Sequence, residues 1–119
     1  MLPHIPALRR GKPYASLDQV EVKSCQTGAP MARISQVNAG IIRKDLAQIS
    51  ESRSALKQFS TDRLLEICRE AAAAFTEKTL PLGDQGCTQS PTDYVQTLSA
   101  TSGLPHVMVR RNMQKIAHA

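Results

Sequence analysis

The hydrophobic period of this chain changes at Asn38, and that change limits the folds available to it. Before Asn38, apolar and polar side chains alternate over residues 20–22 and 31–37, which is typical of half-buried β-strands. After it, apolar residues recur every three or four positions, which is typical of amphipathic helices. The sequence therefore predicts an α+β chain, with N-terminal β-hairpins over 1–37 followed by three to four α-helices over 38–119.

Two tight turns divide the predicted strand region. The first reverses the chain around Gly11 and Lys12, and the second places Gly28 and Pro30 between the two alternating segments. Glycine supplies a positive φ angle, and proline ends a turn because its own φ is fixed. Two turns in succession indicate a meander or a pair of two-stranded ribbons.

The first two helices are predicted from their caps and apolar stripes. Asn38 is a suitable N-cap for one helix that continues as far as Leu56, and Ser60 for a second. The segment 80–90 is rich in glycine and polar residues and is predicted to be a loop. The expected stripes consist of Ile42, Leu46, Ile49, Arg53 and Leu56 in the first helix, and of Leu64, Ile67 or Cys68, Ala71 and Phe75 in the second.

Two further helices are expected after residue 90. Ser90 as N-cap, Pro91 at the first helical position and Asp93 two residues later form a strong helix start, and Gly103 marks its end. Pro105 can start the last helix, whose pattern reaches the C-terminus without a stop signal. We therefore expect the chain to be truncated at its C-terminus.

Composition indicates one small domain with a thin core. The chain has 119 residues and no tryptophan, and aromatics make up only 3% of it, so alanine and aliphatic side chains must form the core. The net charge of +5 comes from short, separated basic clusters, which are typical of solvated helix faces. The chain has no apolar run that suggests a signal peptide or a membrane span. We expect a cytoplasmic protein with reduced cysteines and no membrane partner.

The sequence supplies no catalytic, cofactor-binding or metal-binding residue that we can assign. Cys87 follows Gln85 and Gly86, but no basic side chain lies within several residues to stabilise a thiolate, so a loop cysteine is expected. Cys68 is predicted to be a buried core thiol, and Cys25 lies at a hairpin. The three histidines, His4, His106 and His118, have no carboxylate at a suggestive spacing and are predicted to be surface or terminal residues. Both the GxGxxG fingerprint and a CxxC pair are absent.

The order of these elements resembles the N-terminal portion of the aldehyde dehydrogenase superfamily. The resemblance runs from about Ala7 to about Ile116. Its motifs are the Gly-Lys turn of "RRGKPY", the Thr-Gly turn of "QTGAPMARIS", the helix "NAGIIRKDLAQISESRSAL", the Ser-x-x-Arg start of "STDRLLEICREAAAAF", the helix with a glycine turn "YVQTLSATSGLP", and the helix "HVMVRRNMQKI". Ser24-Cys25-Gln26 replaces the family's usual Asn-Pro, which indicates a divergent branch.

The resemblance implies an α/β fold for the intact protein and a segment of its cofactor domain for residues 1–119. The intact enzyme would use NAD or NADP to oxidise or reduce an aldehyde or acyl group, through a cysteine that attacks the carbonyl. That cysteine and the cofactor pocket would lie in the missing C-terminal portion, so this chain alone is expected to be inactive and to bind no cofactor. The family also implies a homo-oligomer.

An alternative from a different class is a small basic helical module that binds nucleic acid or a protein. Arg110, Arg111 and Lys115 on the last helix would be its contacts. Few aromatics and the acids on the other helices argue against this alternative, so nucleic acid is not expected as a partner.

Overall fold

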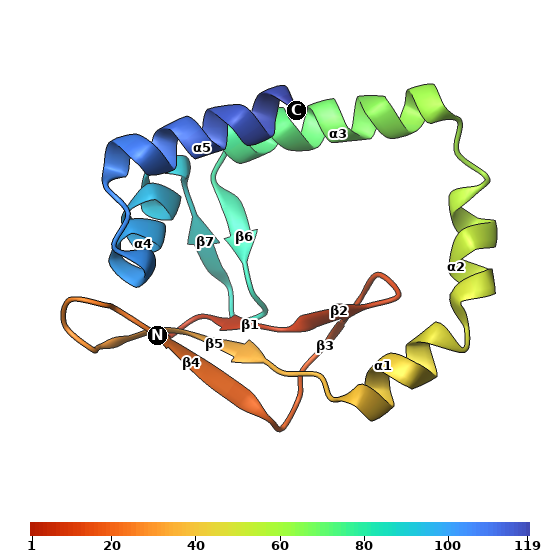
Figure 1. Cartoon of the computed structure of the whole chain (residues 1–119), viewed down its shortest axis with the longest axis horizontal. Helices are drawn as coiled ribbons and strands as arrows, with labels where there is room; N and C mark the ends of the chain where they lie inside the picture. Colours follow the sequence, from red (N-terminus) through yellow and green to blue (C-terminus); the bar gives the residue numbers. More distant parts are fainter.

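The computed structural model describes residues 1–119 and confirms the α+β fold, in which N-terminal strands precede helices (Figure 1). The strands are β1 (His4–Ile5), β2 (Ala7–Arg9), β3 (Lys12–Tyr14), β4 (Gln19–Lys23), β5 (Pro30–Ser35), β6 (Leu80–Leu82) and β7 (Cys87–Gln89). The helices are α1 (Ala39–Leu46), α2 (Ile49–Leu56), α3 (Thr61–Glu77), α4 (Pro91–Ser102) and α5 (His106–His118).

Both predicted N-terminal hairpins are confirmed. Strands β2 and β3 pair around a two-residue turn in which Arg10 and Gly11 have φ angles of 52° and 77°. Two successive positive φ angles match the right-handed twist of the flanking strands. Strands β4 and β5 pair antiparallel on either side of the turn that contains Gly28.

The β4–β5 hairpin gains a third strand that the sequence did not indicate. The two-residue strand β1 runs parallel to β5, with His4 opposite Arg33, so the order in the sheet is β1-β5-β4. The backbone N–H of Arg33 donates to the carbonyl of Pro3 at 2.9 Å. This strand brings His4 into the sheet, where its carbonyl accepts the backbone N–H of Asp84 at 3.1 Å.

The first predicted helix is in fact two helices, which raises the number of helices to five. Asn38 caps α1 as expected, and its side chain accepts the Ile41 N–H at 2.9 Å. The helix then stops at Ala47, and α2 starts after Gln48, whose φ and ψ of −109° and 15° are not helical. No glycine or proline marks this break. Neither helix has a buried residue, so α1 and α2 form an exposed arm, defined here as residues 39–56.

Helices α3, α4 and α5 share a small apolar core. Val95, Val109 and Met113 are buried there, and Phe75 meets Tyr94 edge to face with ring centroids 5.0 Å apart. The predicted caps are confirmed. Ser90 and Asp93 form a capping box at the start of α4, and Gly103 ends that helix in the left-handed conformation.

The prediction of a loop over residues 80–90 is wrong, because β6 and β7 form a hairpin there. Its turn has glycine at both ends, Gly83 and Gly86, each with a φ of +71°. The alternation is too short, and the turn too rich in polar residues, to signal strands in the sequence. This hairpin runs from the helices to the sheet (Figure 1).

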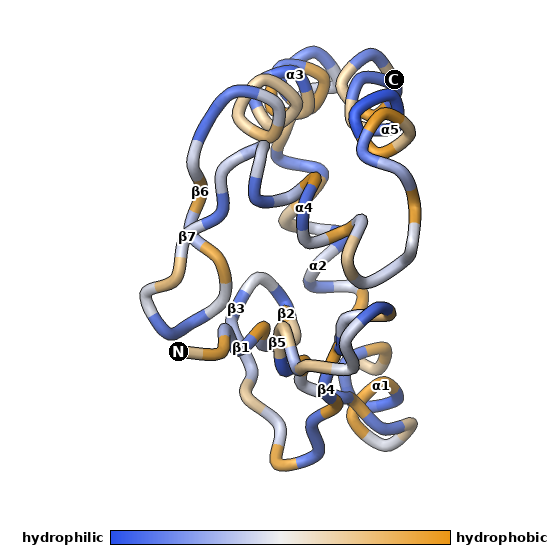
Figure 2. Tube along the Cα trace, turned by 90° about the vertical axis from the view of Figure 1, so that its left-hand side faces the viewer, coloured by the Kyte–Doolittle hydropathy of each residue, from blue (hydrophilic) through white to orange (hydrophobic).

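The chain is open rather than densely packed. Its radius of gyration is 16.7 Å, whereas a compact domain of this length has one of about 13–14 Å. Only 7 of the 119 residues are buried, which confirms the thin core expected from composition. Hydrophobic residues lie along α1 as well as along α3 and α5 (Figure 2). None of the helices combines the length and the apolar character that crossing a membrane requires.

Candidate functional site

The prediction that His4 is a surface or terminal residue is wrong, because its side chain is buried in a polar network. The Nδ1 atom lies 2.8 and 2.9 Å from the two carboxylate oxygens of Asp84, and Nε2 lies 2.9 Å from Oγ of Ser35. The backbone N–H of Ser16 also donates to that Oγ at 2.9 Å. Asp84 is 80 residues away in the chain, so sequence spacing could not reveal the pair.

Serine, histidine and aspartate in this order are also the residues of a hydrolytic triad, but the surroundings do not suit catalysis. Ser35 is only 6% exposed, and its oxygen already contacts both His4 and the Ser16 N–H. A nucleophile needs an open approach for a substrate carbonyl. The network instead joins the tip of the β6–β7 hairpin to the sheet, and we call it the hairpin latch, made of His4, Ser35 and Asp84.

None of the three cysteines belongs to a metal-binding set, because no group of three or more metal-ligating side chains occurs. Cys87 is half-buried on β7 rather than in a loop, while Cys25 is exposed at the β4–β5 turn, as expected. Cys68 is exposed on α3, so the prediction of a buried core thiol is wrong. The stripe of α3 is only partly covered, because few elements pack on that helix.

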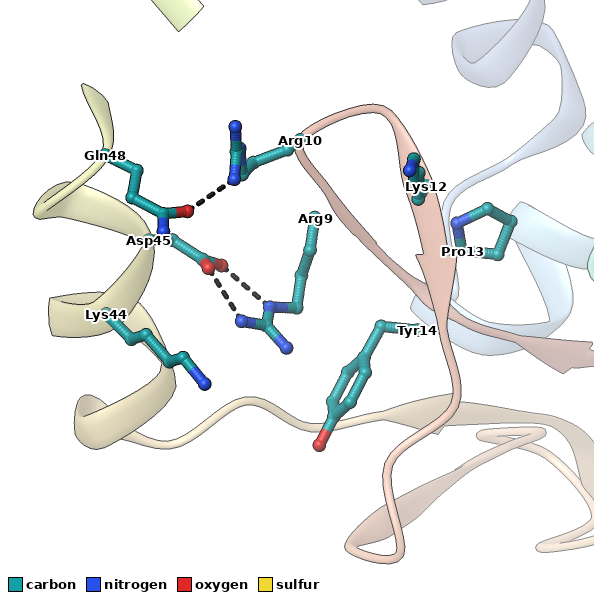
Figure 3. Close-up of a pocket in the computed structure, with 8 residues that line it drawn as sticks. All are labelled: Arg9, Arg10, Lys12, Pro13, Tyr14, Lys44, Asp45 and Gln48. Atoms are coloured by element: carbon teal, nitrogen blue, oxygen red, sulfur yellow. Dashed lines mark hydrogen bonds and ion pairs between the residues drawn. The ribbon is translucent and has the colours of Figure 1, made fainter. Parts of the chain in front are cut away.

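A polar hollow lies between the β2–β3 hairpin and α1 (Figure 3). It has a volume of about 350 Å³, and we call it the basic cleft. Its lining contains four cationic side chains and one carboxylate. The lining residues are Arg9, Arg10, Lys12, Pro13, Tyr14, Lys44, Asp45 and Gln48.

A fixed arginine stands at the centre of the basic cleft. The Nε and Nη2 atoms of Arg9 donate to the two carboxylate oxygens of Asp45 at 2.8 and 2.7 Å. Its guanidinium carbon also lies 4.8 Å from the centroid of the Tyr14 ring, a cation–π contact. The hydrogen bond from Arg9 lowers the pKa of Asp45 below its ordinary value, and the charges of Arg10 and Lys44 lower it further, against an opposing effect of desolvation.

The second arginine of the cleft joins the hairpin to the second helix of the arm. Arg10 donates to Gln48 and pairs with Glu51. Both partners lie at or just after the break between α1 and α2. The sequence shows the clusters Arg9-Arg10-Lys12 and Arg43-Lys44 separately, but only the fold places them together with Asp45.

The basic residues singled out on the last helix are exposed, as are His106 and His118. Arg110, Arg111 and Lys115 all face solvent, whereas Val109 and Met113 on the same helix are buried. Ile116, which shares their spacing, is 58% exposed. Only part of the apolar face of α5 is therefore packed in the core.

Comparisons with protein-family models, with curated proteins and with solved structures give no match to this chain. The function must therefore be inferred from the residues and their arrangement alone.

Proposed function

We propose that this chain is the N-terminal segment of an NAD(P)-dependent, aldehyde-dehydrogenase-like oxidoreductase, and that its role there is structural. The observation that carries the proposal is the apolar surface of the arm. Its large apolar side chains are exposed to solvent, although burial of apolar groups is the main driving force of folding. The exposed fractions are 47% for Ile42, 55% for Leu46, 52% for Ile49 and 57% for Leu56, and Phe59 just beyond the arm is 50% exposed.

Covering this surface would stabilise the protein substantially. Full burial of a leucine or isoleucine side chain contributes about 1.5–3 kcal/mol, so covering the exposed half of each contributes roughly 1 kcal/mol. Five such residues give on the order of 5 kcal/mol, which is comparable to the whole stability of a small domain. The remainder of the cofactor domain of the same enzyme is the part that would cover this surface under the resemblance.

The order of the elements supports the same proposal. The turn at Arg10 and Gly11, the turn that contains Gly28, the Asn38-capped helix and the Ser60-capped helix follow one another as the resemblance implies. The Ser60 side chain accepts the backbone N–H of Arg63 at 3.2 Å, so the serine of the Ser-x-x-Arg motif caps α3. Helix α4, closed by Gly103, and helix α5 complete the order.

The test compares two purified proteins, the product of the complete reading frame that contains these codons and the 119-residue chain. Each is incubated with NAD or NADP and with short and long aldehydes or acyl thioesters, and nicotinamide absorbance is followed. We expect the complete protein to reduce or oxidise the nicotinamide and the 119-residue chain to be inactive. Replacing Ile49 and Leu56 together by aspartate in the complete protein should reduce the yield of folded enzyme. The exposed pair Arg110 and Arg111, both changed to alanine, is the matched control. A complete protein without nicotinamide chemistry would refute the proposal.

A further inference from the structure

Several hydrogen-bond donors of the basic cleft have no acceptor within the chain, and an anion would supply one. Three hydrogen-bond donors around Arg9 have no partner in the chain: its own Nη1, the ammonium group of Lys44 and the hydroxyl of Tyr14. Figure 3 shows these three side chains in the same cleft, with the Lys44 ammonium and the Tyr14 ring on either side of the guanidinium. Unpaired donors gathered in one cleft, with no acceptor of the chain bonded to them, suit an oxyanion.

The charges around the cleft do not cancel. Arg9 is paired with Asp45 and Arg10 with Glu51, while Lys12 and Lys44 have no ion-pair partner. The four cations and two carboxylates therefore leave two positive charges at the cleft. A ligand that carries two negative charges would balance them.

The cleft is also largely organised before a ligand arrives. The two bonds to Asp45 and the contact with the Tyr14 ring hold the Arg9 guanidinium in place, and the Arg9 side chain is only 25% exposed. A donor already fixed by the protein loses little conformational entropy when the ligand binds. Only the Lys44 side chain, which is exposed on α1, must be ordered.

The two unbalanced positive charges and the spread of the donors favour a phosphate group over a carboxylate. Asp45 occupies the Nε–Nη2 edge of Arg9, and two N–H groups on Nη1 and one on Nη2 remain free. The three free N–H groups of Arg9, the Lys44 ammonium and the Tyr14 hydroxyl offer donors from three different side chains, and a carboxylate, with one negative charge, would balance only one of the two positive charges. A tetrahedral phosphate presents acceptor oxygens in several directions and carries up to two charges at neutral pH. We propose that the basic cleft binds a phosphate dianion, either free or as the monoester group of a small molecule.

This inference goes beyond the proposed function and does not depend on it. Binding to the 119-residue chain is to be measured by calorimetry at fixed chloride concentration, with inorganic phosphate, glycerol phosphate and acetate as probes. We expect both phosphate probes to bind with a Kd below about 1 mM and acetate at least about tenfold more weakly. Binding should strengthen between pH 5 and pH 8, because phosphate gains its second charge over that range. If glycerol phosphate binds more tightly than inorganic phosphate, the monoester is the natural source.

Three variants separate a built site from general positive charge. Lys44→Gln removes one free donor and should weaken phosphate binding about tenfold, which is the usual effect of losing a hydrogen bond to a charged group. Tyr14→Phe keeps the ring under Arg9 and should weaken it about threefold through loss of the hydroxyl. Lys57→Gln makes the same charge change outside the cleft lining and should have no effect. Circular dichroism checks that all three variants keep the wild-type helix content.

Several results would overturn the proposal. These are absence of phosphate binding to the folded wild-type chain, equal binding of acetate, and equal weakening by Lys57→Gln and Lys44→Gln. Tighter binding of a DNA or RNA oligonucleotide, weakened equally by changes at Lys57 and Arg111, would also count against it. That result would show a diffuse basic surface in place of a cleft for one phosphate group.

Discussion

Two glycines in one turn provide a matched pair of substitutions for the hairpin latch. Gly83 and Gly86 both have a φ of +71°, so alanine suffers the same backbone strain at either position. Their surroundings differ completely. A Cβ atom on Gly83 would lie 2.0 Å from the carbonyl oxygen of His4 and 2.9 Å from its carbonyl carbon, whereas one on Gly86 would meet nothing within 4 Å.

The structure gives a magnitude for each substitution. Placing alanine in the left-handed region costs about 1–2 kcal/mol, which is the whole effect expected for Gly86→Ala. In Gly83→Ala the hairpin tip must also move away from β1, because the obstacle is backbone. That movement breaks the 3.1 Å hydrogen bond from the Asp84 N–H to the His4 carbonyl, which contributes about 0.5–1.5 kcal/mol, and disturbs the side-chain bonds between the same residues. We expect a total loss of about 2–4 kcal/mol for Gly83→Ala.

Amide hydrogen exchange measured by NMR can locate this loss. In Gly83→Ala the Asp84 amide should lose its protection, and the Arg33 amide, which donates to Pro3 just before β1, should lose part of its own. The amides of α4 and α5 should change little in either variant. Urea midpoints at constant protein concentration give the two free energies. If Gly83→Ala is no more destabilising than Gly86→Ala, the hairpin tip does not rest on the His4 backbone, and the predicted difference has no basis.

Three other expectations concern the core, the Cys87 thiol and the capping box. Met113→Asp should abolish cooperative unfolding or cause aggregation, because it buries an unpaired charge. The double variant Arg110→Ala, Arg111→Ala should leave the thermal midpoint nearly unchanged. Submicromolar, sequence-selective nucleic-acid binding that is lost in this double variant would instead support the binding-module alternative. Cys87→Ser should change no nicotinamide-linked turnover, since the 119-residue chain should show none; activity lost in this variant would contradict that expectation. Hydrogen bonds from Ser90 lower the pKa of Asp93 in the folded chain. The ionised carboxylate should therefore stabilise the fold at pH values above the unfolded-state pKa of about 4, and this stabilisation should be lost as pH falls through the lower folded-state pKa. Urea midpoints between pH 7 and pH 2 should therefore fall more in the wild type than in Asp93→Asn.

Elements whose signals are local could be predicted from the sequence. The Gly11 turn, the caps at Asn38, Ser60 and Ser90, and the stop at Gly103 each depend on residues within one turn of the chain, and all are present. Each of these residues either accepts a backbone N–H or adopts a positive φ. Such local preferences act before any tertiary contact forms.

Features that depend on distant residues could not be predicted. The strand β1 pairs with an edge of β5, and His4 bonds to Asp84, which lies 80 residues later in the chain. The break at Gln48 has no local signal, and it coincides with tertiary contacts from Arg10. The basic cleft likewise combines a hairpin with a helix that starts more than twenty residues later.

The exposed arm has a consequence for how the chain tolerates a break in its backbone. The parts before and after the arm meet directly, through the hairpin latch and through the Cys25 N–H, which donates to the Ala100 carbonyl at 2.8 Å. The arm itself carries trypsin sites at Lys44 and Arg53 and buries no residue. Limited proteolysis should therefore nick the arm first and leave two fragments that stay associated in native mass spectrometry. New chain termini introduced within 47–48 should be accepted for the same reason, because the contacts that join the two parts do not involve the arm.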